Sequence, residues 1–409
     1  MTSTPDIKPE GRTEPALPDQ DDPLGLVIGG GGARAAYQVG ALRYFARRFP
    51  DLRIPIVTGV SAGAISAALL ASHHGSFKQA VDELVSLWQN LRVEDVFRVD
   101  TPSLAWSGAR WAFQLLSGGA GGGVRVEGLV DTSPLRDYLS EALHAVDGEL
   151  TGVQYNLAKG RLQAVALSTS SYTTGQSMTW IQGCDLQEWE RPQRRSRKTV
   201  LTVNHVMASC ALPLVFPAVK IGDAWYGDGG IRLAAPLSPA LHLGAERILA
   251  ISTRYDRDQV EADRPSVLGY PPPAQVIGSI MNSVFLDLID QDALRLERLN
   301  RLLERLPEEE REGLRIIKLL ILRPSVDLGR LANEFEPQLP RTFRFLMRGL
   351  GTKQTKSPDF LSLLLFQPDY LGRLIELGEA DAEARSEEID AFILNEQSQG
   401  AASSVRPHG

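Results

Sequence analysis

The sequence lacks the features that mark secreted, membrane-spanning and nucleic-acid-binding proteins. It has two cysteines, too few for a disulfide framework, which favours a reducing compartment. Its first residues show no basic start followed by an apolar stretch, so no secretory signal is recognisable. Its longest apolar runs, such as 360–366, are too short to cross a bilayer. The formal net charge of -7 argues against a general nucleic-acid surface. We expect a cytoplasmic protein, with peripheral membrane contact left open.

Composition divides the chain into four predicted segments. Residues 1–22 are polar and contain several prolines, which predicts a disordered tail. Residues 23–270 alternate short apolar stretches with helical spacing and are predicted to form the main domain. Residues 271–396 begin with three prolines and are mainly helical in pattern, which predicts an extension packed on that domain. Residues 397–409 are polar and are expected to be a flexible tail.

The order of the predicted elements indicates an α/β protein. An apolar stretch at 24–28 leads through four glycines into a helical pattern at 33–48. A second short strand is predicted at 54–58, and a small-residue helix at 64–72. Two strand–turn–helix units in succession are typical of a parallel sheet with crossover helices. Further along, we predict hairpins at 162–181 and 218–226, a strand at 247–253, helices within 274–306 and 361–384, and a strand at 314–322 that could rejoin the sheet.

The sharpest local signal is the pentapeptide Gly-Val-Ser-Ala-Gly with Ser61 at its centre. It stands between a predicted strand and a predicted helix. A nucleophile in that position sits on a strained turn, and the flanking glycines leave room for so tight a bend. The alternative is a serine that caps the helix beginning at Ala62. The motif alone favours neither interpretation.

A second signal is the run Gly29-Gly30-Gly31-Gly32-Ala33-Arg34 between the first strand and the first helix. Backbone N–H groups at such a place can hold an anion, either a nucleotide phosphate or the oxyanion of an acyl-transfer intermediate. The dinucleotide pattern fails because Ala35 replaces its third glycine, and no Gly-Lys-Ser/Thr follows. An oxyanion loop therefore fits better, given the serine motif after the next strand.

A third signal is Asp228-Gly229-Gly230, which follows a short predicted strand. An aspartate at a strand end before two glycines can point into a cleft. Alone, the pattern more often marks an ordinary turn aspartate.

Together these three motifs resemble the patatin-like phospholipase family. The resemblance covers roughly residues 24–253 and includes the intervening block 208–213, Ala-Ser-Cys-Ala-Leu-Pro. It departs from the family pattern at Ala35, where a glycine is common, and before Pro236, where an asparagine is common. The resemblance implies a three-layer αβα sandwich with a central, mostly parallel sheet, a catalytic domain at 23–270 and a helical C-terminal extension.

The resemblance also implies a lipid acyl hydrolase with a Ser61–Asp228 catalytic dyad and an acyl-serine intermediate. The oxyanion hole would be formed by Gly30, Gly31, Gly32 and Ala62. A free carboxylate is a weak base, so burial would have to raise the pKa of Asp228. None of the six histidines stands in a glycine-bounded loop after a strand, and we expect none to be the base. No metal or cofactor is implied.

Three regions carry predictions about the substrate. Arg34 could bind a phosphate or carboxylate of the substrate, or it could pair with a carboxylate of the protein. The segment 102–126 contains Trp106, Trp111 and Phe113 beside a glycine-rich stretch and could be a lipid-facing lid or part of the core. The segment 191–198 holds five basic residues that could meet anionic headgroups or form a solvated loop.

Other function classes stay open at this point. The substrate of the expected reaction is a phospholipid or another fatty-acyl ester. The same serine could support acyl transfer or thioester hydrolysis. The fold could also serve as a non-catalytic lipid-binding module, and the glycine run alone could bind a nucleotide. An intact serine, aspartate and glycine loop favour an enzyme.

Overall fold

The computed structural model describes most of the chain. The described residues are 22–99, 106, 109–110, 113, 128–257, 261, 263, 267, 269–285, 288–355 and 357–394. The tails predicted at 1–22 and 397–409 lie outside this set, apart from Asp22. Most of the predicted lid at 102–126, including Trp111, also lies outside it. Trp106 and Phe113 are described, and both side chains are exposed.

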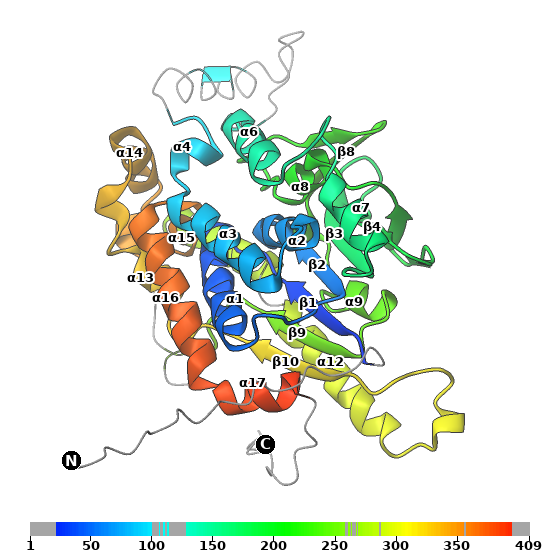
Figure 1. The fold of residues 1–409 in the computed structure, drawn as a ribbon. Helices are drawn as coiled ribbons and strands as arrows, with labels where there is room; N and C mark the ends of the chain where they lie inside the picture. The colour runs from blue at the N-terminus through cyan, green and yellow to red at the C-terminus, as the bar shows by residue number, and fades with distance from the viewer. Residues whose placement is uncertain are drawn as a thin grey trace, which may run out of the picture.

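One mixed sheet of ten strands runs through the described part of the chain. Its main path has the order β10-β9-β1-β2-β3-β4-β6-β5, and the five strands from β10 to β3 are parallel. Their parallel pairing confirms the predicted α/β class (Figure 1). The strands are β1 (Leu24–Ile28), β2 (Ile56–Val60), β3 (Ala164–Ser171), β4 (Ser177–Gly183), β5 (Glu190–Arg191), β6 (Arg194–Lys198), β7 (Val219–Ile221), β8 (Ala224–Asp228), β9 (Arg247–Ile251) and β10 (Lys318–Leu322).

Strand β8 continues the line of β2 along the same edge of β3. The first part of β3 pairs with β2, ending with Ser168 opposite Val60. The next residue, Thr169, pairs with Asp228 of the antiparallel strand β8. Because β4 occupies the other edge of β3, β2 and β8 meet end to end. The residue that follows Val60 and the last residue of β8 are therefore brought together by the register of β3.

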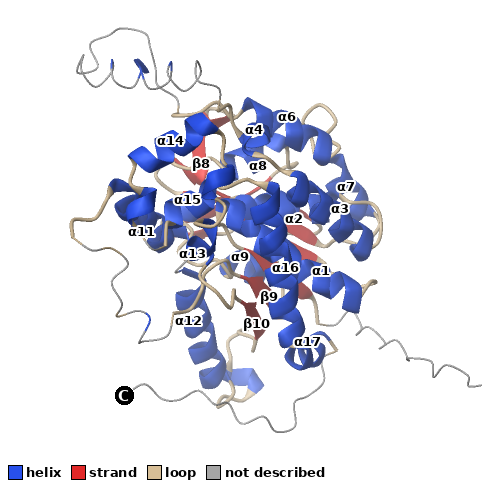
Figure 2. Cartoon of the chain, turned by 90° about the vertical axis from the view of Figure 1, so that its left-hand side faces the viewer, coloured by secondary structure: helices blue, strands red, loops and turns tan. Residues whose placement is uncertain are grey.

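Helices cover both faces of the sheet. Alternate residues of each strand enter different apolar clusters; in β1, Leu26 and Ile28 face one cluster and Val27 the other. The first face carries α1 (Ala36–Arg48), α2 (Ala62–Ser72), α3 (Phe77–Asn90), α7 (Thr151–Ala158), α8 (Val203–Ser209) and α16 (Pro368–Ala384), and the second carries α9 (Ser238–His242) and α12 (Leu288–Leu303). The molecule is thus a three-layer αβα sandwich, as predicted (Figures 1 and 2).

The C-terminal third is built into this sandwich. Strand β10 extends the parallel sheet beside β9, and α16 packs along α1 and α3. The remaining helices of this region are α11 (Pro273–Phe285), α13 (Leu328–Ala332), α14 (Arg341–Gly349), α15 (Asp359–Leu364) and α17 (Ser386–Ile393). The two small helices α4 (Val93–Val96) and α6 (Ser133–Ala142) lie near α14 in both views (Figures 1 and 2). The predicted division at residue 270 stays a prediction.

Several element boundaries differ from the predicted ones for local reasons. Strand β2 begins at Ile56 rather than 54, because Pro55 has no N–H to donate to a ladder. The helix predicted from 33 starts as a 3-10 turn over Gly32–Ala35. The strand predicted from 314 begins only at Lys318, and the helical pattern at 361–384 divides where Pro368 starts α16. Within the described residues, no helix is long and apolar enough to cross a bilayer.

Candidate active site

Ser61 occupies a strained turn between β2 and α2. Its φ of 54° and ψ of -134° lie in a region that residues with side chains rarely adopt. The flanking glycines are required by contact: a Cβ on Gly59 would lie 2.6 Å from the Gly63 carbonyl oxygen, and one on Gly63 2.4 Å from the carbonyl oxygens of Ile28 and Gly29. The Ser61 side chain makes no capping hydrogen bond to α2, so the helix-cap interpretation is wrong.

The Ser61 hydroxyl donates a hydrogen bond to Asp228. The distance from Ser61 Oγ to Asp228 Oδ2 is 2.6 Å. The second carboxylate oxygen, Oδ1, accepts the backbone N–H of Gly230 at 2.9 Å. Asp228 is fully buried, and this burial raises its pKa from 3.8 to about 7, although the two hydrogen bonds act in the opposite direction. A carboxylate with a pKa near 7 is a far better general base than one near 4.

A neighbouring helix end braces the backbone of the elbow. Ser209 Oγ accepts the backbone N–H of Ser61 at 2.9 Å and donates to the Ser168 carbonyl at 2.7 Å. Cys210 Sγ donates to the Ser61 carbonyl at 3.0 Å. The sequence places Ser209 and Cys210 in a block that resembles the family, but it does not reveal that Ser209 holds the nucleophile. A serine at the end of an otherwise apolar helix is the one local signal.

The glycine loop lies directly against the serine. A Cβ on Gly30 would stand 3.0 Å from Ser61 Cβ and 3.6 Å from Ser61 Oγ. Gly31 and Gly32 have φ values of 149° and 54°, which favour glycine. A Cβ on Gly32 would also lie 2.2 Å from the carbonyl oxygen of Leu363. The predicted oxyanion-hole residues, Gly30 to Gly32 and Ala62, are therefore neighbours of Ser61, and their role in binding an oxyanion stays a prediction.

An apolar cavity opens beside Ser61. Its walls come from the glycine loop, α2, α3, α6, the segment after α8, and α15 with the residues that follow it. None of the lining residues is charged. The lining residues are Gly31, Gly32, Ser61, Ala62, Ile65, Trp88, Leu91, Val96, Leu135, Cys210, Leu212, Phe216, Leu363, Leu364 and Phe366. The cavity volume is about 50 Å³, and a water molecule's share of liquid is about 30 Å³. An acyl chain must therefore displace lining side chains as it enters.

Arg34 does not line this cavity. Its side chain is buried, and its guanidinium forms an ion pair with Asp359 at 2.6 Å. It also donates to Ser362 Oγ at 2.7 Å. The geometry therefore favours pairing with a protein carboxylate over the predicted binding of substrate. Through this contact α15, at the far end of the chain, anchors the helix turn that follows the glycine loop.

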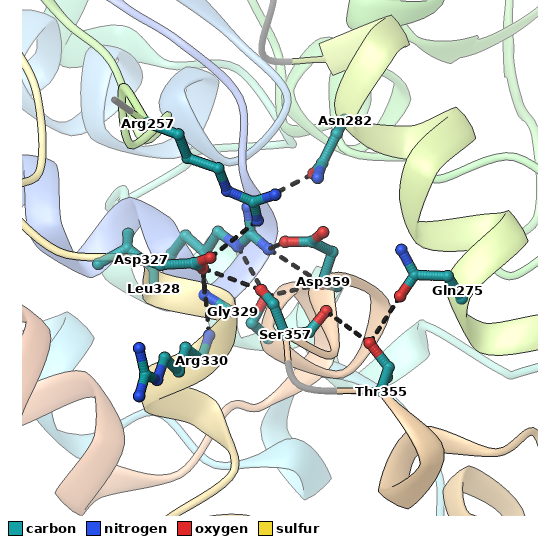
Figure 3. A network of polar contacts seen from close by, with 12 residues as sticks. Arg257, Gln275, Asn282, Asp327, Leu328, Gly329, Arg330, Thr355, Ser357 and Asp359 are labelled. Carbon is teal, nitrogen blue, oxygen red and sulfur yellow. Dashed lines mark hydrogen bonds and ion pairs between the residues drawn. The ribbon is translucent and has the colours of Figure 1, made fainter. Parts of the chain in front are cut away.

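Asp359 belongs to a wider polar network (Figure 3). Ser357 Oγ donates to Asp327 Oδ1 at 3.0 Å, and Arg257 donates to Asp327 Oδ2 at 2.8 Å. Asn282 Oδ1 accepts from Arg34 at 3.5 Å. The three arginines and three aspartates of the adjoining pocket balance in charge; they are Arg34, Arg254, Arg257, Asp256, Asp327 and Asp359. This balance makes the pocket a poor anion site. The roles of Asp359 and Ser362 leave no trace in the local sequence.

The described histidines lie away from the dyad. His205 contacts Thr202 and Trp180, and burial lowers its pKa to about 4. His73 and His144 approach Glu83 at the protein surface. The hydrogen-bond partner of Ser61 Oγ among the described residues is Asp228. The geometry thus offers a carboxylate where a triad would use an imidazole.

The fold and the site together define the chain as an α/β protein of the lipid acyl hydrolase class. The model of the family described as patatin-like phospholipase matches residues 26–241, more than half of the chain. The chain belongs to this family.

Solved structures with similar folds include three phospholipase-related proteins at low similarity. Human GIVD cytosolic phospholipase A2, in complex with methyl gamma-linolenyl fluorophosphonate, is 13% identical with a TM-score of 0.43; the match covers 91% of this chain and 58% of that one. VipD from Legionella pneumophila is 14% identical with a TM-score of 0.35, covering 95% and 72%. ExoU from Pseudomonas aeruginosa, in complex with SpcU, is 15% identical with a TM-score of 0.26, covering 91% and 80%. The chain thus spans less than two thirds of the human phospholipase. A search of the curated proteins found no match.

Proposed function

We propose that the protein hydrolyses carboxylic esters of fatty-acyl lipids, with Ser61 as the nucleophile and Asp228 as the general base. The observation that carries this proposal is the 2.6 Å hydrogen bond from the Ser61 hydroxyl to the Asp228 carboxylate. The carboxylate has no solvent exposure, and the hydroxyl borders an apolar cavity. Phospholipids and other fatty-acyl esters combine such an acyl chain with a reactive carbonyl.

The reaction proceeds in two halves. In the first, Asp228 accepts the Ser61 proton while Oγ bonds to the ester carbonyl carbon, and the carbonyl oxygen becomes an oxyanion beside the N–H groups of Gly30–Gly32 and Ala62. The ester C–O bond then breaks, and the leaving alkoxide takes the proton from Asp228. In the second half, Asp228 accepts a proton from water, which attacks the acyl-Ser61 ester. The fatty acid leaves and Ser61 regains its proton.

Burial of Asp228 suits it to this task. With a pKa of about 7, the carboxylate is largely ionised at mildly alkaline pH and still basic enough to share the serine proton. The Ser61 hydrogen bond is already formed, so proton transfer needs no movement of either side chain. Glycines on both sides keep the elbow and the oxyanion loop close to the reacting carbonyl.

A panel of phospholipids, lysophospholipids and triacylglycerols tests the proposal with wild type, Ser61→Ala and Asp228→Asn. We expect fatty-acid release by wild type and loss of release in both variants. A fluorophosphonate probe should label wild type and leave Ser61→Ala unlabelled. Ser72→Ala is a matched control, because Ser72 is a buried serine whose hydroxyl has no hydrogen-bond partner among the described residues. Equal lipid turnover by wild type and Ser61→Ala would refute the assignment.

The same assay separates the competing functions. Transacylated product after addition of an alcohol would identify an acyltransferase on the same dyad. Turnover of acyl thioesters in preference to lipid esters would identify a thioesterase. Lipid binding without probe labelling or turnover would identify a non-catalytic module.

Two broader predictions stay proposals. The main domain at 23–270 would carry catalysis, and the segment 271–396 would complete the site through α15, whose Leu363 and Leu364 line the cavity. A cytoplasmic location with peripheral membrane contact is tested by cell fractionation, in which the protein would divide between the supernatant and a salt-extractable membrane fraction.

A further inference from the structure

Helix α14 presents two opposite faces. Phe343 and Met347 point inward, and each is 2% exposed. Phe345 points outward with 81% of its surface exposed, and the adjacent Leu346 is 46% exposed. A single exposed apolar residue is ordinary on a protein surface. A phenylalanine so fully exposed beside a leucine, on a helix already anchored from below, marks a face that is available to an apolar partner.

The same stretch is strongly basic in an acidic protein. Residues 341–358 contain three arginines and two lysines and no Asp or Glu, whereas the whole chain has a net charge of -7. Arg344 donates to the Pro337 carbonyl, and Arg348 pairs with Glu336 at 2.6 Å. Neither Arg341 nor Lys353 has an ion-pair partner within the described part of the chain. The exposed apolar side chains are therefore flanked by uncompensated positive charge.

This helix lies close to the candidate active site. The ring of Phe343 is 5.4 Å from that of Phe97, which is 5.8 Å from that of Phe216. Phe216 lines the cavity beside Ser61. Three aromatic rings thus connect the inner face of α14 with the cavity wall. A surface that contacts the outer face of α14 would stand a few side chains from the nucleophile.

We propose that the outer face of α14 docks on a lipid surface with anionic headgroups. Phe345 and Leu346 enter the interfacial region, and Arg341 and Lys353 face the phosphates and carboxylates of the headgroups. Apolar side chains beside cations on one amphipathic helix are the pattern of membrane-surface helices. This inference rests on the proposed lipid hydrolysis, because it supplies the surface from which the substrate comes.

A protein partner fits this face less well. The helix has nine residues and spans roughly 13 Å at 1.5 Å per residue. A stable protein interface buries about 800 Å² on each partner, far more than two side chains supply. A lipid surface has no such requirement, since it needs only apolar insertion and charge.

The basic strands β5 and β6 offer a competing membrane surface. They carry Arg191, Arg194, Arg195, Arg197 and Lys198, the run predicted from the sequence to meet headgroups. No exposed large apolar side chain belongs to either strand. Arg197 is exposed there and serves as a comparison for Arg341. Helix α12, at another side of the molecule, supplies two further controls: the exposed Leu302 and Arg301 (Figures 1 and 2).

Vesicle flotation tests the proposal in the full chain carrying Ser61→Ala, so that bound lipid is not consumed. The vesicles are phosphatidylcholine alone and phosphatidylcholine mixed with phosphatidylserine. We expect the mixed vesicles to bind the protein more tightly, with binding weakened by added salt. Phe345→Ser should weaken binding about tenfold, as expected for loss of a partly buried aromatic side chain. Arg341→Glu should weaken binding to the mixed vesicles only, while Leu302→Ser, Arg301→Glu and Arg197→Glu bind like the parent.

Other outcomes overturn the proposal. Unchanged binding in Phe345→Ser and Arg341→Glu would remove α14 from the membrane surface, and loss of binding in an α12 or β6 control would transfer the role there. A change of oligomeric state in Phe345→Ser, measured by sedimentation velocity with vesicle binding intact, would make the face a protein interface.

Hydrolysis of a soluble short-chain ester, measured with Ser61 present, separates this inference from the proposed function. Phe345→Ser should keep the wild-type rate on that ester. If wild type hydrolyses no ester and yet α14 variants lose vesicle binding, the docking surface stands and the enzymatic proposal fails.

Discussion

Replacing Asp228 by asparagine should stabilise the protein while abolishing its activity. The carboxylate is fully buried, with a pKa raised from 3.8 to about 7 by that burial. Asparagine has the same shape, and its oxygen can still accept the Gly230 N–H while its amide donates to Ser61. The substitution therefore removes the buried charge without opening a cavity. Active-site groups that cost stability in this way are common in enzymes.

The sign and size follow from proton linkage. Because the folded-state pKa is raised, ionisation disfavours the folded protein, and stability is lost as pH rises towards and through 7. A difference of roughly 3 pKa units corresponds to about 4 kcal/mol when ionisation is complete. Between pH 5 and pH 8, wild type should lose about 2 to 3 kcal/mol of unfolding free energy through this group. Asp228→Asn lacks that loss.

Urea unfolding of both proteins at pH 5 and pH 8, followed by tryptophan fluorescence, measures the effect. The stability advantage of Asp228→Asn should grow with pH. Ser61→Ala is the control: it keeps the carboxylate and removes a hydrogen bond that lowers its pKa, so its stability should depend on pH at least as steeply as that of wild type. A stability difference between wild type and Asp228→Asn that stays constant from pH 5 to pH 8 would refute the reasoning.

Three further predictions concern the same site. The kcat/KM of wild type for a soluble ester should fall as pH drops through about 7, because protonated Asp228 cannot accept the serine proton; a profile flat from pH 5 to 8 would contradict this. Ser209→Ala should lower kcat about tenfold with little change in KM, since it leaves a buried N–H unpaired; Ser72→Ala, measured alongside, should not. Asp359→Ala should destabilise the fold by about 3 to 5 kcal/mol in urea unfolding, because it leaves Arg34 buried without its carboxylate. Asp359→Asn, which keeps a hydrogen-bond acceptor, should cost less than Asp359→Ala, and equal costs would show that the ion pair is unimportant.

The sequence predicts the local parts of the site well. The elbow at Ser61 and the glycine loop at 29–34 announce themselves because each needs residues without side chains at fixed places. The strand–turn–helix order around them was enough to predict a parallel sheet. The positive φ at Ser61 and the close contacts at Gly59 and Gly63 explain why that motif is so informative.

The contacts that join distant segments could not be predicted in the same way. By itself, Asp228 reads as a turn aspartate, and only the register of β3 places it against Ser61. The partners of Arg34 lie more than 300 residues along the chain, so the sequence left open whether it binds substrate or a protein carboxylate. Ser209 is invisible for the same reason, since its two hydrogen bonds reach separate strands.

The acyl-enzyme itself gives the most direct test of the dyad. Wild type is mixed with a slowly hydrolysed fatty-acyl ester, quenched in acid, and analysed by peptide mass spectrometry. We predict one acyl group on the peptide that contains Ser61, less of it in Asp228→Asn and none in Ser61→Ala. Acylation of another residue, such as Cys210, or continued ester turnover by Ser61→Ala, would contradict the account.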